Sequence, residues 1–201
     1  MIYRILGGIF LLIVLCGLNS DFAMAQAYRN AVHVPPTEVY QSMLNFVDRK
    51  EYAKIMGPLN ILSPITSHIT AKFTGNPADG IKKAIDQGNP DEILLSVQIL
   101  ILLDIKDLLD EAAQNVDPAP DVAKAHVNAA RLDYELLSSY VREKDFAADQ
   151  KTRKNFTDSL RALGSESLYS TEKAKVNTQQ LKQRWTEIVF NLSRIFTSKV
   201  F

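Results

Sequence analysis

The chain has 201 residues, with 23 lysines and arginines against 23 aspartates and glutamates, and 46% of its residues are hydrophobic. The balanced charge excludes a basic nucleic-acid binder and an acidic tail protein, and the apolar share excludes a disordered chain. A single cysteine excludes a disulfide scaffold. We therefore expect an ordinary globular domain without a nucleic-acid partner.

The first 25 residues have the pattern of a secretory signal peptide. Arg4 is followed by the uncharged run of residues 5–18, and the segment ends in Ala23-Met24-Ala25. A basic start, a short apolar run and small residues at the cleavage site are typical of such peptides. The pattern predicts a bacterial, Sec-type signal peptide that is cleaved after Ala25, and hence a periplasmic or secreted protein.

Two alternatives exist for this segment. It could remain uncleaved as an anchor, although its apolar run is shorter than the roughly 20 residues of a comfortable membrane span. Cys16 could carry a lipid, but that processing requires a small residue before the cysteine, and Leu15 stands there. Cleavage would remove the only cysteine, so the mature chain could form neither disulfides nor thiolate metal sites. We expect no membrane span after cleavage.

Helix signals begin after an extended leader over residues 26–36. A first helix opens at Thr37 or Glu38 and runs to about Met56, where Gly57-Pro58 is expected to stop it. Ser63-Pro64 predicts the start of a second, short helix with Ser63 as its N-cap.

Two identical tripeptides mark the next junctions. Gly75-Asn76-Pro77 and Gly88-Asn89-Pro90 enclose a predicted helix over residues 77–87. Glycine suits the left-handed residue that ends a helix, asparagine caps the next helix, and proline fits its first turn. We interpret the repeat as helix punctuation and not as a binding loop.

A helix over about 90–115 is predicted to be the centre of the protein. Nine of the eleven residues in 93–103 are apolar, and a helix that is apolar nearly all round must be surrounded by other helices. The run is too short to cross a membrane, since eleven residues span only about 16 Å. A turn over 117–121 follows, with Asp121 as the expected cap of the next helix.

Three further helices complete the predicted fold. They cover residues 122–143, 145–163 and a C-terminal stretch around Trp185. The apolar run 99–103 could also form a strand, but its continuation to Ala112 favours one long helix, and strand signals are absent elsewhere. The sequence therefore predicts one all-α domain over residues 37–201, built as a bundle of about four long helices plus shorter N-terminal ones. Their apolar stripes comprise Ala123, Val127, Ala130, Tyr134, Leu137 and Val141, then Phe146, Phe156, Leu160 and Leu163, and finally Leu181, Trp185, Ile188, Leu192 and Ile195.

Asp104, Asp107 and Glu111 form a row of carboxylates at i, i+3 and i+7 on the central helix. Such a row could help to hold a hard cation inside a bundle, although the Glu-x-x-His motifs of di-iron bundles are missing. The alternative is an internal ion pair. If the helices over 90–115 and 122–143 form an antiparallel hairpin, paired residue numbers add to about 236, which places Asp104 beside Arg131.

His126 is the remaining candidate metal ligand, at the edge of an apolar stripe. It has no second histidine at a metal-ligand spacing such as HExxH, and His68 and His33 are equally isolated.

We find no catalytic motif and predict no cofactor. The sequence favours an exported, non-enzymatic bundle with a binding or assembly role and an unidentified protein partner or small ligand. The alternative is a ligand or metal site near Asp104, His126 and Tyr134.

Overall fold

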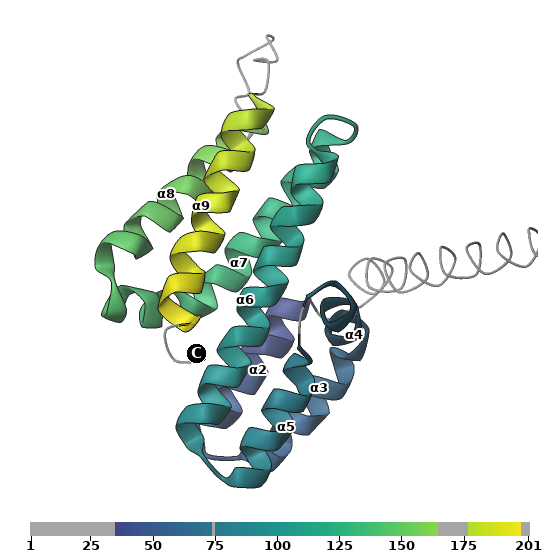
Figure 1. The fold of residues 1–201 in the computed structure, drawn as a ribbon, viewed down its shortest axis with the longest axis vertical. Coiled ribbons are helices and arrows are strands. Elements are labelled where there is room, and N and C mark those ends of the chain that lie inside the picture. The colour runs from purple at the N-terminus through teal and green to yellow at the C-terminus, as the bar shows by residue number, and fades with distance from the viewer. Residues whose placement is uncertain (1–34, 74, 165–176, 198–201) are drawn as a thin grey trace, which may run out of the picture.

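The computed structural model describes residues 35–73, 75–164 and 177–197, and the regular elements in these ranges are all helical (Figure 1). The predicted all-helical fold is thus confirmed for this part of the chain. The predicted signal peptide and residues 26–34 of the predicted leader lie outside it. In chain order the elements are α2 (Pro36–Asp48), η1 (Tyr52–Ile55), α3 (Met56–Ile61), α4 (Ser63–Lys72), α5 (Pro77–Gln87), α6 (Pro90–Asn115), α7 (Pro120–Lys144), α8 (Phe146–Ala162) and α9 (Thr178–Thr197).

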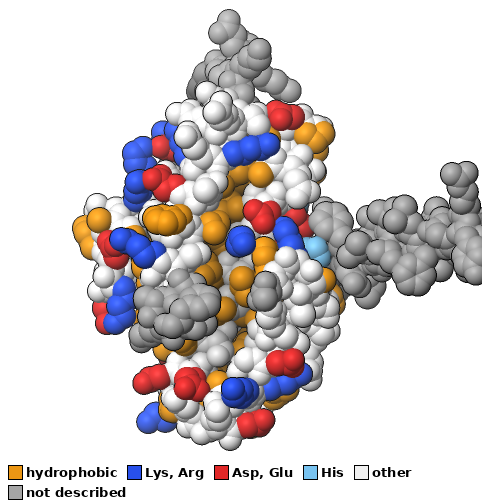
Figure 2. Space-filling view, in the orientation of Figure 1, with side chains coloured by type: hydrophobic (Ala, Val, Ile, Leu, Met, Phe, Trp, Pro, Cys, Tyr) orange, Lys and Arg blue, Asp and Glu red, His pale blue; other side chains and the backbone are white. Residues whose placement is uncertain are grey.

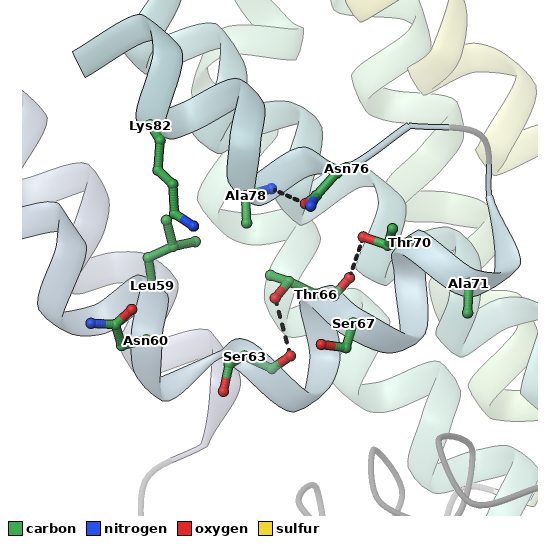
Figure 3. Close-up of a pocket in the computed structure, with 10 residues that line it drawn as sticks. All are labelled: Leu59, Asn60, Ser63, Thr66, Ser67, Thr70, Ala71, Asn76, Ala78 and Lys82. Atoms are coloured by element: carbon green, nitrogen blue, oxygen red, sulfur yellow. Dashed lines mark hydrogen bonds between the residues drawn. The ribbon is translucent and has the colours of Figure 1, made fainter. Parts of the chain in front are cut away.

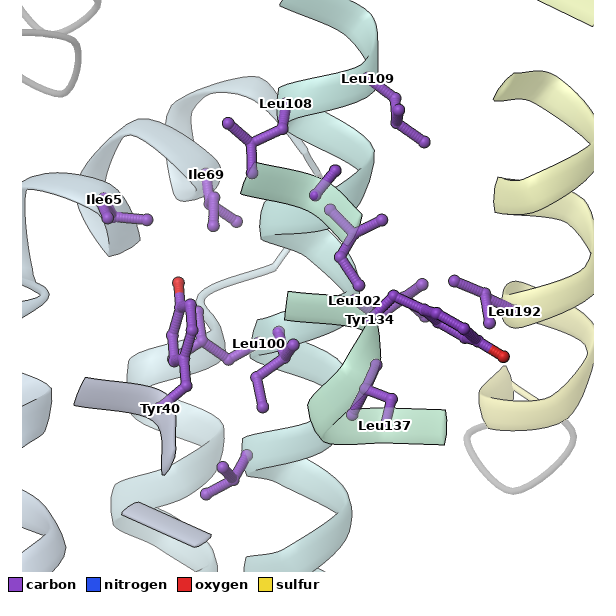
Figure 4. Close-up of a cluster of buried hydrophobic side chains, with 14 of the residues drawn as sticks. Tyr40, Ile65, Ile69, Leu100, Leu102, Leu108, Leu109, Tyr134, Leu137 and Leu192 are labelled. Atoms are coloured by element: carbon purple, nitrogen blue, oxygen red, sulfur yellow. The ribbon is translucent and has the colours of Figure 1, made fainter. Parts of the chain in front are cut away.

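Helices α6 and α7 form the central antiparallel hairpin of the bundle. Helices α2, α4 and α5 pack against α6, while α8 and α9 pack against each other and against the hairpin (Figure 1). As the sequence predicts, α6 is the helix that contacts most of the others. Figure 4 shows Tyr40 of α2, Ile69 of α4, Leu100 of α6, Leu137 of α7 and Leu192 of α9 in one buried core.

The two Gly-Asn-Pro junctions are built as predicted. The side chains of Asn76 and Asn89 each accept hydrogen bonds from two backbone N–H groups in the first turns of α5 and α6. Gly88 ends α5 with a φ of 65°, in the left-handed region that glycine adopts without strain. The bounds of both helices coincide with the predicted ones because the punctuation is local and unambiguous.

The first helix is shorter than predicted. Helix α2 ends at Asp48, and Lys50 has a positive φ of 59°, which breaks the helix well before Met56. Gly57 and Pro58 do not act as a stop, because both lie in the first turn of α3. Proline is tolerated there since N–H groups of a first turn have no partner inside the helix.

Two predicted caps also differ from the structure. The sequence predicts Ser63 and Asp121 as caps, but Leu62 and Ala119 hold the N-cap positions of α4 and α7, and no side chain caps either helix.

Phe146, expected in an apolar stripe, is 56% exposed. The side chain of Asp145 caps α8 by accepting from the N–H of Ala148, so that Phe146 becomes the first residue of the helix.

Within the described ranges, no helix combines the length and the apolar character that crossing a membrane requires.

Candidate metal centre

The row of carboxylates on α6 lies entirely inside the bundle. Asp104 and Asp107 are 0% exposed, and Glu111 is 1% exposed. Positions i, i+3 and i+7 share one face of a helix, and α2, α4 and α7 pack against α6. Each carboxylate of the row interacts with a different one of these three helices.

Asp104 meets α2 instead of its predicted partner. The hydroxyl of Tyr40 donates to Asp104 Oδ2 at 2.9 Å. Arg131 donates to Asn128 at 3.2 Å, and the expected Asp104–Arg131 ion pair is not formed between these two described residues. The buried tyrosine of α2 supplies a donor from inside the core, whereas Arg131 remains partly exposed on α7.

Asp107 meets two side chains of α4. His68 Nε2 lies 3.2 Å from Asp107 Oδ1, and Lys72 Nζ lies 2.8 Å from the same oxygen. Partial burial alone would lower the pKa of Lys72, but hydrogen bonds and Coulomb attraction from Asp107 and Asp110 outweigh it and raise that pKa above its ordinary value. His68 and Lys72 are four residues apart, so they share one face of α4.

Glu111 meets α7. His126 Nε2 lies 3.4 Å from Glu111 Oε2, and the side chains are 12% and 1% exposed. This contact places the hairpin within one residue of the register predicted from the sequence.

These contacts bring four candidate ligands from three helices together; we call His68, Asp107, Glu111 and His126 the metal cluster. Each of the first three offers a ligand atom, and these atoms all lie within 4.8 Å of one another. Two ligands of one zinc ion, at bond lengths of about 2.0–2.2 Å, are separated by roughly 3.3–3.5 Å. Small side-chain rotations would therefore suffice to bring these atoms to bonding distance around one ion.

Tyr134, predicted near Asp104 and His126, belongs to a different polar centre. Its hydroxyl donates to Asp149 Oδ1 at 2.5 Å. The three residues predicted to share a site therefore have different partners: Tyr40 for Asp104, Glu111 for His126 and Asp149 for Tyr134. Only His126 belongs to the metal cluster.

Asp149 on α8 is the centre of this second polar site. Its carboxylate also accepts hydrogen bonds from Arg142 Nε at 3.3 Å and from Arg153 Nε at 3.0 Å. Desolvation would raise the pKa of Asp149, but the hydrogen bonds from Tyr134, Arg142 and Arg153 prevail and hold it below its ordinary value. Burial and the hydrogen bond to Asp149 raise the pKa of Tyr134, so its hydroxyl stays protonated.

His68, Lys72 and Asp149 are not among the site residues that the sequence predicts. A signal existed for the first two, since both lie next to the apolar positions Ile65 and Ile69 of a short helix. For Asp149 the only local signal was Arg153 four residues later, which is equally common on exposed helix surfaces.

Among the described residues, the groove between α3, α4 and α5 holds no comparable cluster. A groove of about 420 Å³ between α3, α4 and α5 is lined by hydroxyl side chains, including Ser63, Ser67 and Thr70, with Lys82 on its far side (Figure 3). Lys82 pairs weakly with Asp79 at 3.8 Å, and no residue of the metal cluster lines the groove. On the face shown in Figure 2, side chains of both charge signs are interspersed, as expected for a solvated surface.

The described residues thus define an all-helical bundle with a buried cluster of histidines and carboxylates. Comparisons with protein-family models, with curated proteins and with solved structures find no match for this chain. The functional inference therefore depends on the cluster itself.

Proposed function

We propose that this protein is an exported helical bundle that binds a divalent transition-metal ion between α4, α6 and α7. The observation that supports the proposal most strongly is the convergence of His68, Asp107 and Glu111, whose ligand atoms lie within 4.8 Å of one another inside the bundle. We assign His126 the fourth ligand position, because its Nε2 already contacts Glu111.

The donor set indicates which metal ions fit. Two imidazoles and two carboxylates suit zinc, iron and similar transition metals, whereas calcium requires six to eight oxygen ligands and magnesium retains much of its water. The ligands come from three helices that already pack together, so the bundle holds them close to their binding positions. A bound ion would also neutralise two carboxylates that are otherwise expensive to bury as a pair.

The rival interpretation assigns the same side chains to a metal-free ionic network. His68, His126 and Lys72 would then serve only as partners of Asp107 and Glu111, and the protein would have a binding or assembly role without a metal. The two interpretations differ in one observable, which is whether a transition metal raises the stability of the folded chain.

Thermal melting of the purified, chelator-treated protein separates them. An ion at 100 times its dissociation constant adds about 2.7 kcal/mol of stability, which corresponds to a rise in Tm of roughly 5–10 °C for a domain of this size. We expect this rise with zinc and, under anaerobic conditions, with ferrous iron, and no comparable rise with calcium.

Matched variants locate the binding site. His68→Gln and Glu111→Gln should each abolish the zinc-dependent rise, because each removes one ligand. Asp149→Asn is the control: it changes an equally buried carboxylate outside the cluster and should retain the zinc response even though its own Tm is lower. A wild-type protein without a zinc response, or ligand variants that keep it, would contradict the proposal.

The proposed export depends on Arg4, the apolar run 5–18 and the Ala23-Met24-Ala25 end. We expect N-terminal sequencing of protein recovered from the cell exterior or periplasm to begin at Gln26. A chain that begins at Met1 or at Cys16 would contradict cleavage after Ala25.

A further inference from the structure

We infer that Lys72 is a built-in competitor for the metal ion: its ammonium group neutralises Asp107 in the metal-free protein and shifts to Asp110 when metal binds. The inference rests on the proposed metal site and adds how that site is regulated. Metal binding becomes an exchange of one cation for another within a fold that is already formed.

The competition follows from a shared oxygen atom. Lys72 Nζ is 2.8 Å from Asp107 Oδ1, and this is the oxygen that faces His68 Nε2 at 3.2 Å. A metal ion bound by His68 and Asp107 would stand within a few ångströms of the ammonium group. Two positive charges at that separation repel strongly in a poorly solvated site, so the ion and the ammonium group cannot both keep their best positions.

Asp110 provides the second position for Lys72. Its Oδ2 already lies 3.3 Å from Lys72 Nζ, so a small rotation of the lysine side chain exchanges one carboxylate for the other. The side chains of Lys72 and Asp110 are 28% and 44% exposed, whereas that of Asp107 is fully buried. The shift therefore moves the ammonium group from the interior towards solvent, where its desolvation is relieved.

Because Lys72 neutralises Asp107 when no metal is bound, we expect a site from which the metal ion can leave without unfolding the protein, unlike a structural metal site. Structural metal sites stabilise a fold that fails to form without the ion. Here Lys72 supplies a positive charge to Asp107 in the absence of metal, and the core around it is apolar and packed. The metal-free bundle should hence be folded and ready to take up or release an ion.

Zinc titration of Lys72→Met tests the inference, because methionine keeps an unbranched apolar stem and removes the charge. We expect zinc to bind about 10- to 100-fold more tightly, the equivalent of one charged hydrogen bond that no longer has to be broken. Lys106→Met is the matched control. Lys106 lies over the Phe73 ring at 4.3 Å, as Lys72 does at 5.4 Å, and its removal should change zinc affinity by less than about threefold.

A double-mutant cycle tests the second position of Lys72. Asp110→Asn removes the alternative partner, so we expect weaker zinc binding in the wild-type background. In the Lys72→Met background the same change should have little effect, because no ammonium group is left to move. If Lys72→Met does not fold, as judged by circular dichroism, Lys72→Gln replaces it with the same expectation.

The outcomes separate this inference from the proposed metal site. If neither the wild type nor Lys72→Met binds zinc, the metal site itself is wrong. If the wild type binds zinc and Lys72→Met binds no more tightly, or if Lys106→Met has the same effect, the site stands and the competitor role of Lys72 is overturned. Tighter binding in Lys72→Met alone, with the coupling to Asp110, supports it.

Discussion

Two centres in this bundle bury carboxylates equally deeply but surround them with different basic side chains. Asp149 on α8 is held by two arginines and a tyrosine hydroxyl. Asp107 and Glu111 on α6 are instead contacted by two histidines and one lysine. Arginine is always charged and never a metal ligand, whereas neutral histidine binds transition metals.

Under the proposed function, the first centre stabilises the fold and the second binds a ligand. The cations around Asp149 are permanently charged, and with Tyr134 they connect α7 to α8 through hydrogen bonds to both carboxylate oxygens. The partners of Asp107 and Glu111 can exchange, since a metal ion can replace a proton or an ammonium group at the same atoms. The comparison predicts large stability effects at the first centre and ligand-dependent effects at the second.

The largest effect is expected from Asp149→Asn. The change weakens hydrogen bonds from Tyr134, Arg142 and Arg153 at a fully buried position, and we expect the free energy of unfolding at neutral pH to fall by about 3 kcal/mol. Urea denaturation measures it. Asp158→Asn on the same helix removes contacts with exposed Lys154 and Arg161 and a longer one with Arg184 at 3.9 Å, and it should cost at most about 1 kcal/mol. Equal costs for the two variants would contradict the structural role of Asp149.

The acid response of the Asp149 centre should be visible in the same assay. The native pKa of Asp149 is lowered, so its contribution is present above the unfolded-state value of about 3.9 and is lost as pH falls through the native pKa. We expect the difference in unfolding free energy between the wild type and Asp149→Asn to shrink as the pH is lowered from about 5 to about 2. A difference that stays constant over this range would show that the carboxylate charge is not the stabilising feature.

A smaller effect is expected at Asp104, which belongs to the predicted row but not to the metal cluster. Tyr40→Phe removes the hydroxyl that donates to Asp104, and hydrogen bonds to charged groups contribute about 1.5–3 kcal/mol. The variant should therefore lower stability by roughly that amount while leaving the zinc-dependent rise in Tm unchanged. Loss of the zinc response would extend the metal site to Asp104.

The smallest effect is expected at Thr152, one turn after Asp149 on α8. Its hydroxyl is buried and has no hydrogen-bond partner among the described residues. Thr152→Val removes this unsatisfied group at nearly constant volume, so we expect a change within about 0.5 kcal/mol, or a small gain in stability. A loss well beyond that value would reveal a hydrogen bond for Thr152 that these residues do not show.

The sequence predicted those features that depend on local patterns. The bounds of α6, the two asparagine caps and the alignment of Asp107 with Glu111 follow from helical periodicity and from short-range hydrogen bonds. The hairpin register was also predictable, because the turn between α6 and α7 is short, and Glu111 consequently meets His126.

The rest of the site depends on packing between distant segments, which one sequence does not reveal. His68 reaches Asp107 only because α4 packs against α6, and Tyr40 reaches Asp104 only because α2 does. The burial of Asp149 was equally hidden, since α8 is a polar helix by composition and becomes buried on one side through α7 and α9. Three of the four residues of the metal cluster were therefore candidates from the sequence, namely Asp107 and Glu111 of α6 and His126 of α7, whereas His68 of α4 was not.

The most direct test of the metal site is an anomalous-difference map from crystals grown with zinc. We expect a peak at about 2.0–2.2 Å from His68 Nε2, with an oxygen of Asp107 and an oxygen of Glu111 at similar distances. Lys72 Nζ should lie closer to Asp110 than to Asp107 in the same crystal. The absence of a peak at the metal cluster under saturating zinc, with zinc bound only at the surface, would contradict the proposed site.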